Sequence, residues 1–559
     1  MSNASVQRIR GLRASLFRFL LSIAACCGAL GTSRAEIARS APLSVQPGQS
    51  VEVKFMGDQL ERFTNAWTAF SCRSELLKAS AKEATFRLSL ASNVMVQIAP
   101  VRLIGSNSLS DLHLIMVDDL PTAQKTNATS KSPQLLGRDT AIEGTTSELQ
   151  ADYFMFTARR KEAVSVEVVA RRLGSSLDPL LRILDQNTNE LVYSLSFNEP
   201  NGDPKIRFTP PKSGTYTIEL RDVSYRGGQK FFYHLRFGNF PLLTAPFPPV
   251  VEAGRKPELK LVGPAVERAI PYHSSVSATD DFRSNPVAAR FRGARGSGFA
   301  QLLESPTRQL KEVEPNDTGE QATKVSLPAG ISGRFEKAGD KDYYEFMLEK
   351  GERVQCVAHT RSLGAPCDVA LQLVDAEGKQ VAESKNTGAD EGLLSARVDK
   401  SGSYRLVVEE LTGAGRPDFV YHLEVRKQGP GYSLSIADEG VEWSANNSVT
   451  LKLSCTREGY DGPVKLSVHG LEGCRTENGT IEAKKTNTTV RIFLPESSTK
   501  IQCFEIFGSG KEEIEPIRAS TLPALRKTFP NMLYPPLQLD GLVWIAPASA
   551  QSRSSEPAK

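Results

Sequence analysis

Two stretches of this 559-residue chain repeat one another, and the repeat constrains the possible folds more than any other feature of the sequence. Residues 151–237 recur at 341–425, so that Asp152-Tyr153-Phe154 corresponds to Asp342-Tyr343-Tyr344. The offset between the copies is 190 residues in the first part and 188 in the second. The repeats of stacked solenoids are much shorter, at about 20–50 residues. Each copy is therefore expected to be a domain with its own hydrophobic core.

Short runs of alternating apolar and polar residues fill the first copy. In the run 163–170, Val164, Val166 and Val168 fall on one face, and similar runs occur at 205–208, 215–220 and 230–237. Such alternation predicts half-buried β-strands. Turn-forming residues separate the runs, and no stretch has a sustained 3.6-residue period. The pattern predicts an all-β chain of tandem antiparallel β-sandwiches.

Breaks rich in Pro, Gly and Ser, such as 121–133, divide the chain into five expected β-domains. The tail after residue 512 contains the apolar run Leu539 to Ile545, with Trp544, which is expected to pack back on the last domain. Residues 546–559 are expected to be disordered. The expected divisions are a targeting segment at 1–35, immunoglobulin-like β-domains at 41–120, 242–309 and 430–512, the two repeated domains at 134–240 and 310–427, and a partly disordered tail at 513–559.

Residues 1–35 are typical of a signal peptide. Four arginines precede the apolar run 19–30, and Ser33-Arg34-Ala35 places small residues at the two positions that signal peptidase needs. We therefore expect export to the periplasm, the cell surface or the medium. Acylation of Cys26, at the lipobox-like Ile23-Ala24-Ala25-Cys26, is the alternative. No later apolar run is long enough to predict a membrane span.

Removal of the signal peptide changes the charge balance. The whole chain has 68 basic and 64 acidic residues, and the first 35 residues contain five arginines and no acid, which leaves 63 basic and 64 acidic residues. A mature net charge of −1 without a clustered basic face gives no indication of a nucleic-acid partner.

Six cysteines follow residue 35, in a chain whose export would permit disulfides. Cys356 and Cys367 align with Val166 and Leu177 of the first copy, so we expect them to be buried free thiols. Cys455 and Cys503 lie on two strand-like runs of the last domain and are the candidate pair for a disulfide.

A motif in the second copy resembles a known family. The stretch 312–318, Glu-Val-Glu-Pro-Asn-Asp-Thr, is followed by Asp340-Lys341-Asp342-Tyr343-Tyr344 and by Ser401-Gly402-Ser403-Tyr404. This series resembles the bacterial pre-peptidase C-terminal domain, a β-sandwich appended to many secreted peptidases and collagenases. The resemblance covers about 312–427 and extends through the repeat to about 135–239. It implies jelly-roll-type sandwiches for both copies, with immunoglobulin-like domains interleaved.

The same resemblance implies a calcium site in the second copy only. Ca²⁺ takes six to eight hard oxygen ligands, which carboxylate and amide side chains supply. The first copy has Ala141-Ile142-Glu143-Gly144 in place of the acidic motif and retains only Asp152, so it is not expected to bind calcium. An acidic linker without an ion is the alternative for the second copy. The candidate ligands are Glu312, Glu314, Asn316, Asp317, Asp340 and Asp342.

Catalytic motifs are not found. The sequence contains no His-Glu-x-x-His, no Gly-x-Ser-x-Gly and no Cys-x-x-Cys, so we expect no enzyme activity. His234 and His422 recur at one repeat position and alternate with apolar residues, which predicts a solvated sheet face for both. Tyr216 and Tyr404 are expected to be buried with their hydroxyl groups bonded to nearby backbone. The three tryptophans are scattered, so no sugar-binding aromatic platform is indicated.

Two functions from different classes fit these observations. The first is an exported, non-catalytic scaffold whose β-sandwiches bind extracellular protein or polysaccharide. The second is an accessory, non-catalytic component of a secreted peptidase or other hydrolase. The first hypothesis depends on the missing catalytic motifs and on the likeness of fold, and a fold alone does not determine function.

Overall fold

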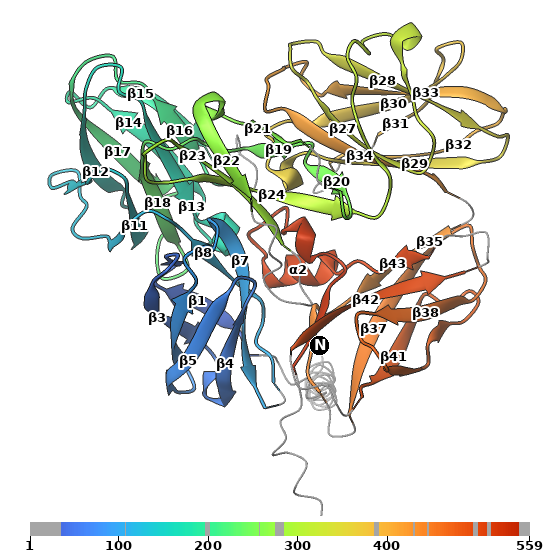
Figure 1. Cartoon of the computed structure of the whole chain (residues 1–559), viewed down its shortest axis with the longest axis horizontal. Helices are drawn as coiled ribbons and strands as arrows, with labels where there is room; N and C mark the ends of the chain where they lie inside the picture. Colours follow the sequence, from blue (N-terminus) through green and yellow to red (C-terminus); the bar gives the residue numbers. More distant parts are fainter. Residues whose placement is uncertain are drawn as a thin grey trace, which may run out of the picture.

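The computed structural model describes residues 35–546, except residue 107 and the segments 196–201, 256–257, 274–283, 385–390, 429–430, 444–446, 496–500 and 511–515. The expected signal peptide, apart from Ala35, and residues 547–559 of the tail lie outside the described residues. The described chain is built almost entirely of β-strands, arranged as a series of two-sheet units (Figure 1), as the alternating pattern predicted. No helix within the described residues has the length and apolar composition to cross a bilayer.

The N-terminal unit, residues 35–120, is a sandwich of two four-stranded sheets. Alternate residues of its strands point into a shared core, so β6 reads as a regular alternation of buried and half-buried positions. One sheet has the order β1 (Ile37–Ala41), β3 (Ser50–Gly57), β6 (Glu83–Leu90), β5 (Cys72–Ala79), and the other β2 (Ser44–Val45), β8 (His113–Val117), β7 (Gln97–Gly105), β4 (Phe63–Thr68).

The first repeat, residues 122–238, and the second repeat, residues 309–428, have the same strand order in both of their sheets. In the first repeat the sheets are β10 (Gln134–Leu135), β12 (Asp152–Ala158), β17 (Gly214–Asp222), β14 (Pro179–Leu184), β15 (Glu190–Leu195), and β16 (Lys205–Phe208), β13 (Val164–Val169), β18 (Phe232–Gly238), β11 (Thr140–Thr145), β9 (Thr122–Gln124). In the second they are β26 (Thr323–Lys324), β28 (Lys341–Leu348), β33 (Gly402–Glu410), β30 (Val369–Asp375), β31 (Gln380–Glu383), and β32 (Leu393–Arg397), β29 (Arg353–His359), β34 (Val420–Gln428), β27 (Ala329–Arg334), β25 (Gln309–Lys311).

One boundary of the first repeat differs from the sequence-based expectation. The segment 121–133, expected to be a joint, contains β9, which pairs in parallel with β11. β25 pairs with β27 in the same way in the second repeat. The strand is only three residues long and mostly polar, so its hydropathy gave no strand signal.

The recurring tyrosines have the role that the sequence predicted. Tyr216 and Tyr404 are each 5% exposed, and their hydroxyl groups donate to the backbone oxygens of Lys212 and Lys400 at 2.6 and 2.8 Å. Each bond ties the start of a central strand to the turn before it, because a buried phenol needs a hydrogen-bond partner.

The middle unit, residues 242–305, is a reduced version of the N-terminal unit. Its sheets have the orders β19 (Ala245–Phe247), β21 (Lys260–Val262), and β20 (Val250–Glu252), β24 (Gly298–Ser305), β23 (Asn285–Phe291), β22 (Ala269–His273). The corresponding sheets of the N-terminal unit have the orders β1, β3 and β2, β8, β7, β4. In both units a residue with a left-handed backbone conformation and then a 3₁₀ turn follow the second strand of the first sheet, β3 or β21. Among the described residues of this unit the hairpin β5–β6 has no counterpart: 28 residues separate β4 from β7, but only 11 separate β22 from β23. The unit is therefore smaller than the full sandwich expected at 242–309.

The last unit, residues 431–510, recruits the tail to complete its second sheet. β44 pairs with both β42 and β36, which confirms that the run around Trp544 packs back on this unit. The sheets are β35 (Gly431–Ile436), β37 (Ser448–Glu458), β41 (Asn487–Phe493), β39 (Arg475–Glu477), and β36 (Gly440–Val441), β44 (Val543–Ile545), β42 (Gln502–Ser509), β38 (Val464–His469), β40 (Thr480–Ile481), with β43 (Ile517–Arg518) beside β42.

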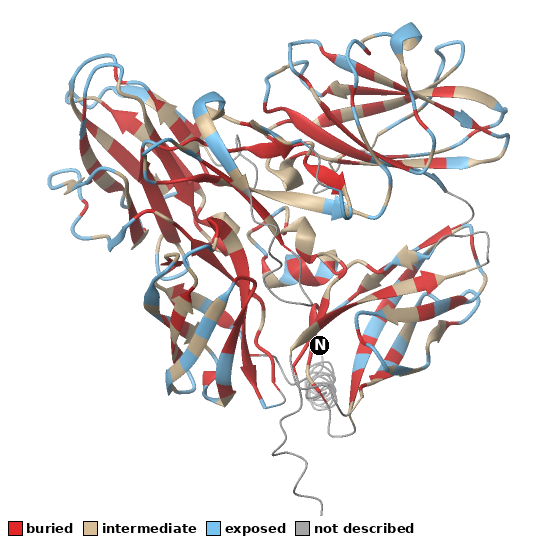
Figure 2. Ribbon diagram, in the orientation of Figure 1, coloured by how far each residue is buried: buried red, intermediate tan, exposed pale blue. Residues whose placement is uncertain are grey.

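The tail also reaches the N-terminal unit. The rings of Trp544 and Trp67 lie 4.5 Å apart, and both are buried. The short helix α2 (Leu522–Thr528) and the residues after it add Leu525, Phe529 and Met532 to the same hydrophobic core. Figures 1 and 2 show this helix, with its buried residues, in the space between the units.

The cysteine pattern differs from the expectation in one respect. The disulfide expected between Cys455 and Cys503 is not formed. The two residues belong to different sheets and different cores: Cys455 packs inside the last unit, whereas Cys503 packs in the core shared with the N-terminal unit. Cys356 and Cys367 are buried free thiols, as predicted.

His234 and His422 are fully buried, so the solvated sheet face expected for them is wrong. Alternation correctly assigned them to the face opposite the core, but that face is closed to solvent at both positions. His234 Nε2 lies 2.8 Å from Asp118 Oδ2, at the end of the N-terminal unit, and its Nδ1 lies 3.5 Å from Glu143. A buried charged network thus replaces the solvent at this junction.

His234 gives this junction a pH dependence. Burial alone would lower the pKa of His234, but its hydrogen bond to Asp118 and the nearby carboxylate of Glu143 outweigh burial and raise the pKa to about 9. The charged ring therefore contributes its stabilisation in full below pH 6.5, its ordinary pKa, and loses it as the pH rises through about 9. Between these values we expect stability to fall by about 1.4 kcal/mol per pH unit from this group. Urea titrations of wild type and His234→Gln should differ in this slope, and parallel pH profiles would contradict the assignment.

Candidate cation site in the second repeat

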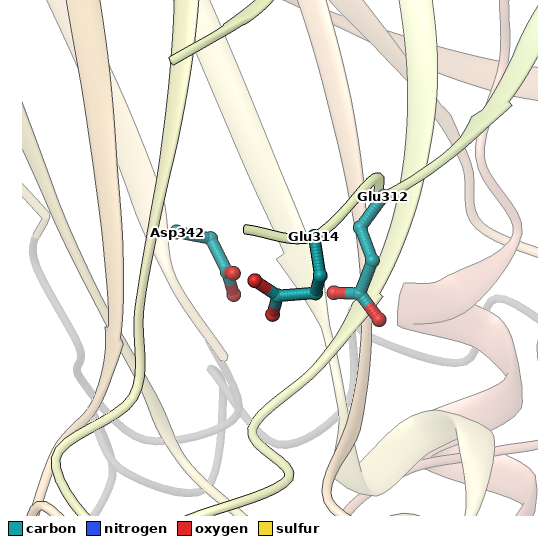
Figure 3. Close-up of side chains that lie close together, drawn as sticks. All are labelled: Glu312, Glu314 and Asp342. Atoms are coloured by element: carbon teal, nitrogen blue, oxygen red, sulfur yellow. The ribbon is translucent and has the colours of Figure 1, made fainter. Parts of the chain in front are cut away.

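Three carboxylates of the second repeat meet where the chain enters it. Glu312 follows β25, Glu314 lies two residues further on, and Asp342 is on β28, with ligand oxygens that all lie within 4.8 Å of one another (Figure 3). Glu312 and Asp342 are buried, whereas Glu314 is exposed. Among the described residues this is the one group of three or more His, Cys, Asp or Glu side chains that could hold a metal ion.

Strand pairing fixes the positions of these side chains. Glu312 N–H donates to Ser332 O at 2.9 Å, which extends the β25–β27 ladder by one residue. Glu312 Oε2 accepts from Arg334 N–H at 2.7 Å, and Asp342 Oδ2 accepts from the Tyr421 hydroxyl at 2.6 Å. A Cβ at Gly333 would overlap both Tyr421 and the Glu312 carboxylate, so glycine keeps the space open for them.

The electrostatics of the cluster are unfavourable for the protein alone. Burial and the nearby Asp342 raise the pKa of Glu312 to about 8. Burial, together with Asp340 and Glu314, raises the pKa of Asp342 to about 7 against the opposing hydrogen bond from Tyr421. Like charges in a low dielectric disfavour ionisation. A cation at this position would offset the repulsion and hold all three groups ionised.

Of the other three predicted ligands, Asn316 lies beside the cluster. Asn316 is fully buried, and neither atom of its side-chain amide has a hydrogen-bond partner within the described structure. Its backbone joins the cluster, since Asn316 N–H donates to Glu314 Oε2 at 3.1 Å and Tyr343 N–H donates to Asn316 O at 3.0 Å. A buried amide without partners is costly, and a bound ion or its water would satisfy the oxygen.

Asp317 and Asp340 lie nearby but have partners of their own. Asp317 pairs with Lys337 at 3.2 Å and is part-exposed. Asp340 Oδ2 accepts from Glu336 N–H at 2.7 Å, and its buried Oδ1 lies 3.6 Å from Lys337 Nζ. The structure therefore brings together Glu312, Glu314 and Asp342 and places Asn316 beside them, while Asp317 and Asp340 face Lys337.

The first repeat carries a cation of its own at the matching position. Lys125 has the position in the first repeat that Glu312 has in the second. The strand pairing shows this: Gln124, just before Lys125, pairs with Glu143 of β11. In the same way Lys311, just before Glu312, pairs with Ser332 of β27. Lys125 Nζ lies 2.9 and 3.0 Å from the two oxygens of Asp152, the counterpart of Asp342. The Tyr233 hydroxyl donates to Asp152 at 2.7 Å, as Tyr421 does to Asp342.

This comparison gives the charge change between the repeats. In the first repeat one ammonium group neutralises one buried carboxylate. The second repeat replaces the ammonium with a carboxylate and adds Glu314, and its nearest cation is Arg334, 3.7 Å from Glu312, where the first repeat has Thr145. Sequence reasoning missed Lys125 because it was assigned to a joint between domains. The signal that could have found it is an offset of 187 residues between Lys125 and Glu312, which becomes apparent only once β9 and β25 are aligned.

No protein-family model matches the chain. A probable subtilase-type serine protease of Deinococcus radiodurans is 30% identical over 155 residues, which are 27% of this chain and 20% of that protein. The chain thus spans about a fifth of this relative's length. Among solved structures, the pre-peptidase C-terminal domain of a Bacillus anthracis collagenase is 14% identical and aligns over 21% of this chain and 96% of that domain, with a TM-score of 0.16. Bacteroides ovatus SGBP-B, solved with a mixed-linkage heptasaccharide, is 9% identical over 66% of this chain and 73% of its own, with a TM-score of 0.14.

Proposed function

We propose that the chain is an extracytoplasmic, non-catalytic scaffold of pre-peptidase C-terminal and immunoglobulin-like modules, and that its second repeat binds a divalent cation. One observation carries the cation proposal: three carboxylates converge where the first repeat places the ammonium group of Lys125. Glu312, Glu314 and Asp342 would hold the ion, with the Asn316 amide oxygen beside them. An all-oxygen ligand set suits Ca²⁺.

Several features support a structural and binding role for the scaffold. The motifs of common hydrolases are missing from the sequence. His234 and His422 are buried in contacts between or within units, and the cysteine thiols Cys356 and Cys367 are enclosed in a core. Extracellular protein or polysaccharide is the proposed class of partner.

The cation proposal predicts a specific stabilisation. Calcium should raise the melting temperature of the mature chain relative to the chain in a chelator, because an ion that binds only the folded state stabilises it by RT ln(1 + [L]/Kd), about 2.7 kcal/mol at 100-fold over Kd. The double variant Glu312→Gln, Asp342→Asn should lose the response. In the chelator this variant should also have a higher melting temperature than wild type, because the substitutions remove the repulsion between the carboxylates.

Glu320→Gln provides the matched control, because Glu320 is an exposed acid on the same segment, outside the cluster. This variant should keep the full calcium response. An equal response from the double variant and from the control, or none from wild type, would disprove the site. Magnesium in place of calcium tests the choice of ion.

A second function has a specific observation in its favour. The similarity to a probable subtilase-type serine protease is compatible with an accessory role beside a secreted peptidase. The genes that neighbour this one, and longer relatives with the same unit order, decide between the two functions. A peptidase domain that recurs beside this architecture would favour the accessory role.

A further inference from the structure

A row of four side chains crosses the outer face of one sheet of the first repeat. Register places Tyr153 of β12 opposite Glu219 of β17, Glu219 opposite Arg182 of β14, and Arg182 opposite Tyr193 of β15. Four neighbouring strands span about 14 Å at the usual spacing of 4.7–4.9 Å, so the two tyrosines stand at the ends of a row of that length.

This face points away from the core. The alternate residues of the same strands, including Phe154, Ile218 and Ile183, pack inside the first repeat. Tyr193 is 54% exposed and Tyr153 is part-exposed. Tyr225, on the turn after β17, is 40% exposed and adds a third ring at the end of the sheet, stacked under Arg221 at 4.1 Å.

The charged groups of the face are balanced among themselves. Arg182 Nη2 donates to Glu219 Oε2 at 2.6 Å, and Arg182 Nη1 donates to Glu190 at 3.3 Å. Arg221 Nε lies 3.4 Å from Glu219 Oε1. Two arginines and two glutamates leave no net charge, which favours a neutral ligand over a polyanion or a polycation.

The chemistry of the row suits a polyhydroxylated chain. A sugar hydroxyl is both a donor and an acceptor, and the Arg182–Glu190 pair, whose side chains are 31% and 40% exposed, presents both kinds of group side by side, while Glu219 lies buried beneath Arg182. The faces of sugar rings are apolar C–H surfaces, which pack on aromatic rings. The two rings and the exposed Arg182–Glu190 pair can thus contact several consecutive sugars at once.

The second repeat supplies an internal comparison. Its matching row is Tyr343, Val407, Gln372 and Glu383, in the same register on β28, β33, β30 and β31. The core residues and strand order recur between the repeats, but the charged pair and the second aromatic ring do not. The outer row of the first repeat is therefore not a requirement of the fold.

We propose that this outer face of the first repeat binds a neutral polysaccharide laid across β12, β17, β14 and β15. The proposal builds on the scaffold function and names its ligand class and contact residues. It is independent of the cation site, which lies in the other repeat. No sequence pattern indicates this platform, because Tyr153 and Tyr193 lie 40 residues apart and only the sheet order brings them into one row.

Native affinity electrophoresis of the mature chain tests this proposal. Gels would contain a neutral glucan, xylan, galactomannan, the acidic polysaccharide alginate, or gelatin as a protein probe. We expect at least one neutral polysaccharide to retard the wild type. The double variant Tyr153→Ala, Tyr193→Ala should weaken that binding about fivefold or more, because two ring contacts are lost. Tyr343→Ala, the matched position of the second repeat, should bind as wild type does.

The outcomes separate the proposals. Retardation by no neutral polysaccharide, or retardation that the double variant keeps, overturns the glycan site. Retardation by gelatin alone, lost with the same tyrosines, assigns the face to a protein partner and also overturns it. A thermal melt of the double variant shows whether it is folded, and its calcium response reports on the cation site separately, so failure of one proposal leaves the other measurable.

Discussion

Replacing Arg236 with methionine is expected to lower the free energy of unfolding by about 3–5 kcal/mol, the usual cost of breaking a buried ion pair. Arg236 is fully buried, and its guanidinium donates to Asp118 at 3.0 Å, to Glu167 at 2.6 Å and to the backbone oxygen of Ser297 at 2.7 Å. Its partners come from the N-terminal unit, the first repeat and the middle unit. The variant removes one cation from two buried carboxylates and leaves Asp118 with His234 alone and Glu167 with Arg172 alone.

Arg475→Met is the control for the change in chemistry. Arg475 pairs with Glu477 at 3.0 Å but is largely exposed, and exposed pairs contribute about 0–1 kcal/mol. Urea unfolding of both variants gives the comparison. If Arg236→Met costs no more than Arg475→Met, the junction is not held by this network.

Trp544→Ala is expected to cost about 3–5 kcal/mol, as for other buried tryptophans cut to alanine. The side chain is 2% exposed, packs 4.5 Å from Trp67, and lies under the buried guanidinium of Arg102 at 5.6 Å. The loss should appear both in the melting temperature and as faster proteolysis of the N-terminal unit, because the ring belongs to the core of that unit.

A double variant tests the contact between the two tryptophans. Trp67→Ala combined with Trp544→Ala should cost less than the sum of the single changes, since residues in contact are not additive. Leu533→Ala, on the same tail but 51% exposed, should have little effect. Strict additivity of the two tryptophan variants would show that the tail does not pack on the N-terminal unit in solution.

The sequence predicted those features that depend on local pattern or on the repeat. The strands, the buried hydroxyl groups of Tyr216 and Tyr404 and the proximity of Glu312 to Glu314 all follow from neighbours along the chain or from alternation. Alternation also separates the two faces of β18, but it does not say what covers the second face. His234 was therefore placed in solvent, although Asp118, more than 100 residues away, lies against it.

The candidate site shows the same limit. The sequence predicted six cation ligands, four in one segment and two at the start of β28. The structure brings three of them together, because Lys337 pairs with Asp317 and Asp340. Nothing in the local pattern marks Lys337 as a competitor or Lys125 as a substitute cation. In both cases a lysine side chain reaches a carboxylate across a turn or from a neighbouring strand. Such a contact can be predicted only when the pairing of the strands is known.

The core that the N-terminal unit shares with the tail has a consequence for biogenesis. Ala35 and Ala546 belong to one hydrophobic cluster, so the N-terminal unit, which is synthesised first, cannot complete its core until the tail residues 522–546 have been made. Until then Trp67 and its neighbours would be open to water, to chaperones and to proteases. A chain truncated before the tail would thus have an incomplete core in its N-terminal unit. Cellular quality control could detect the truncation there, far from the missing residues.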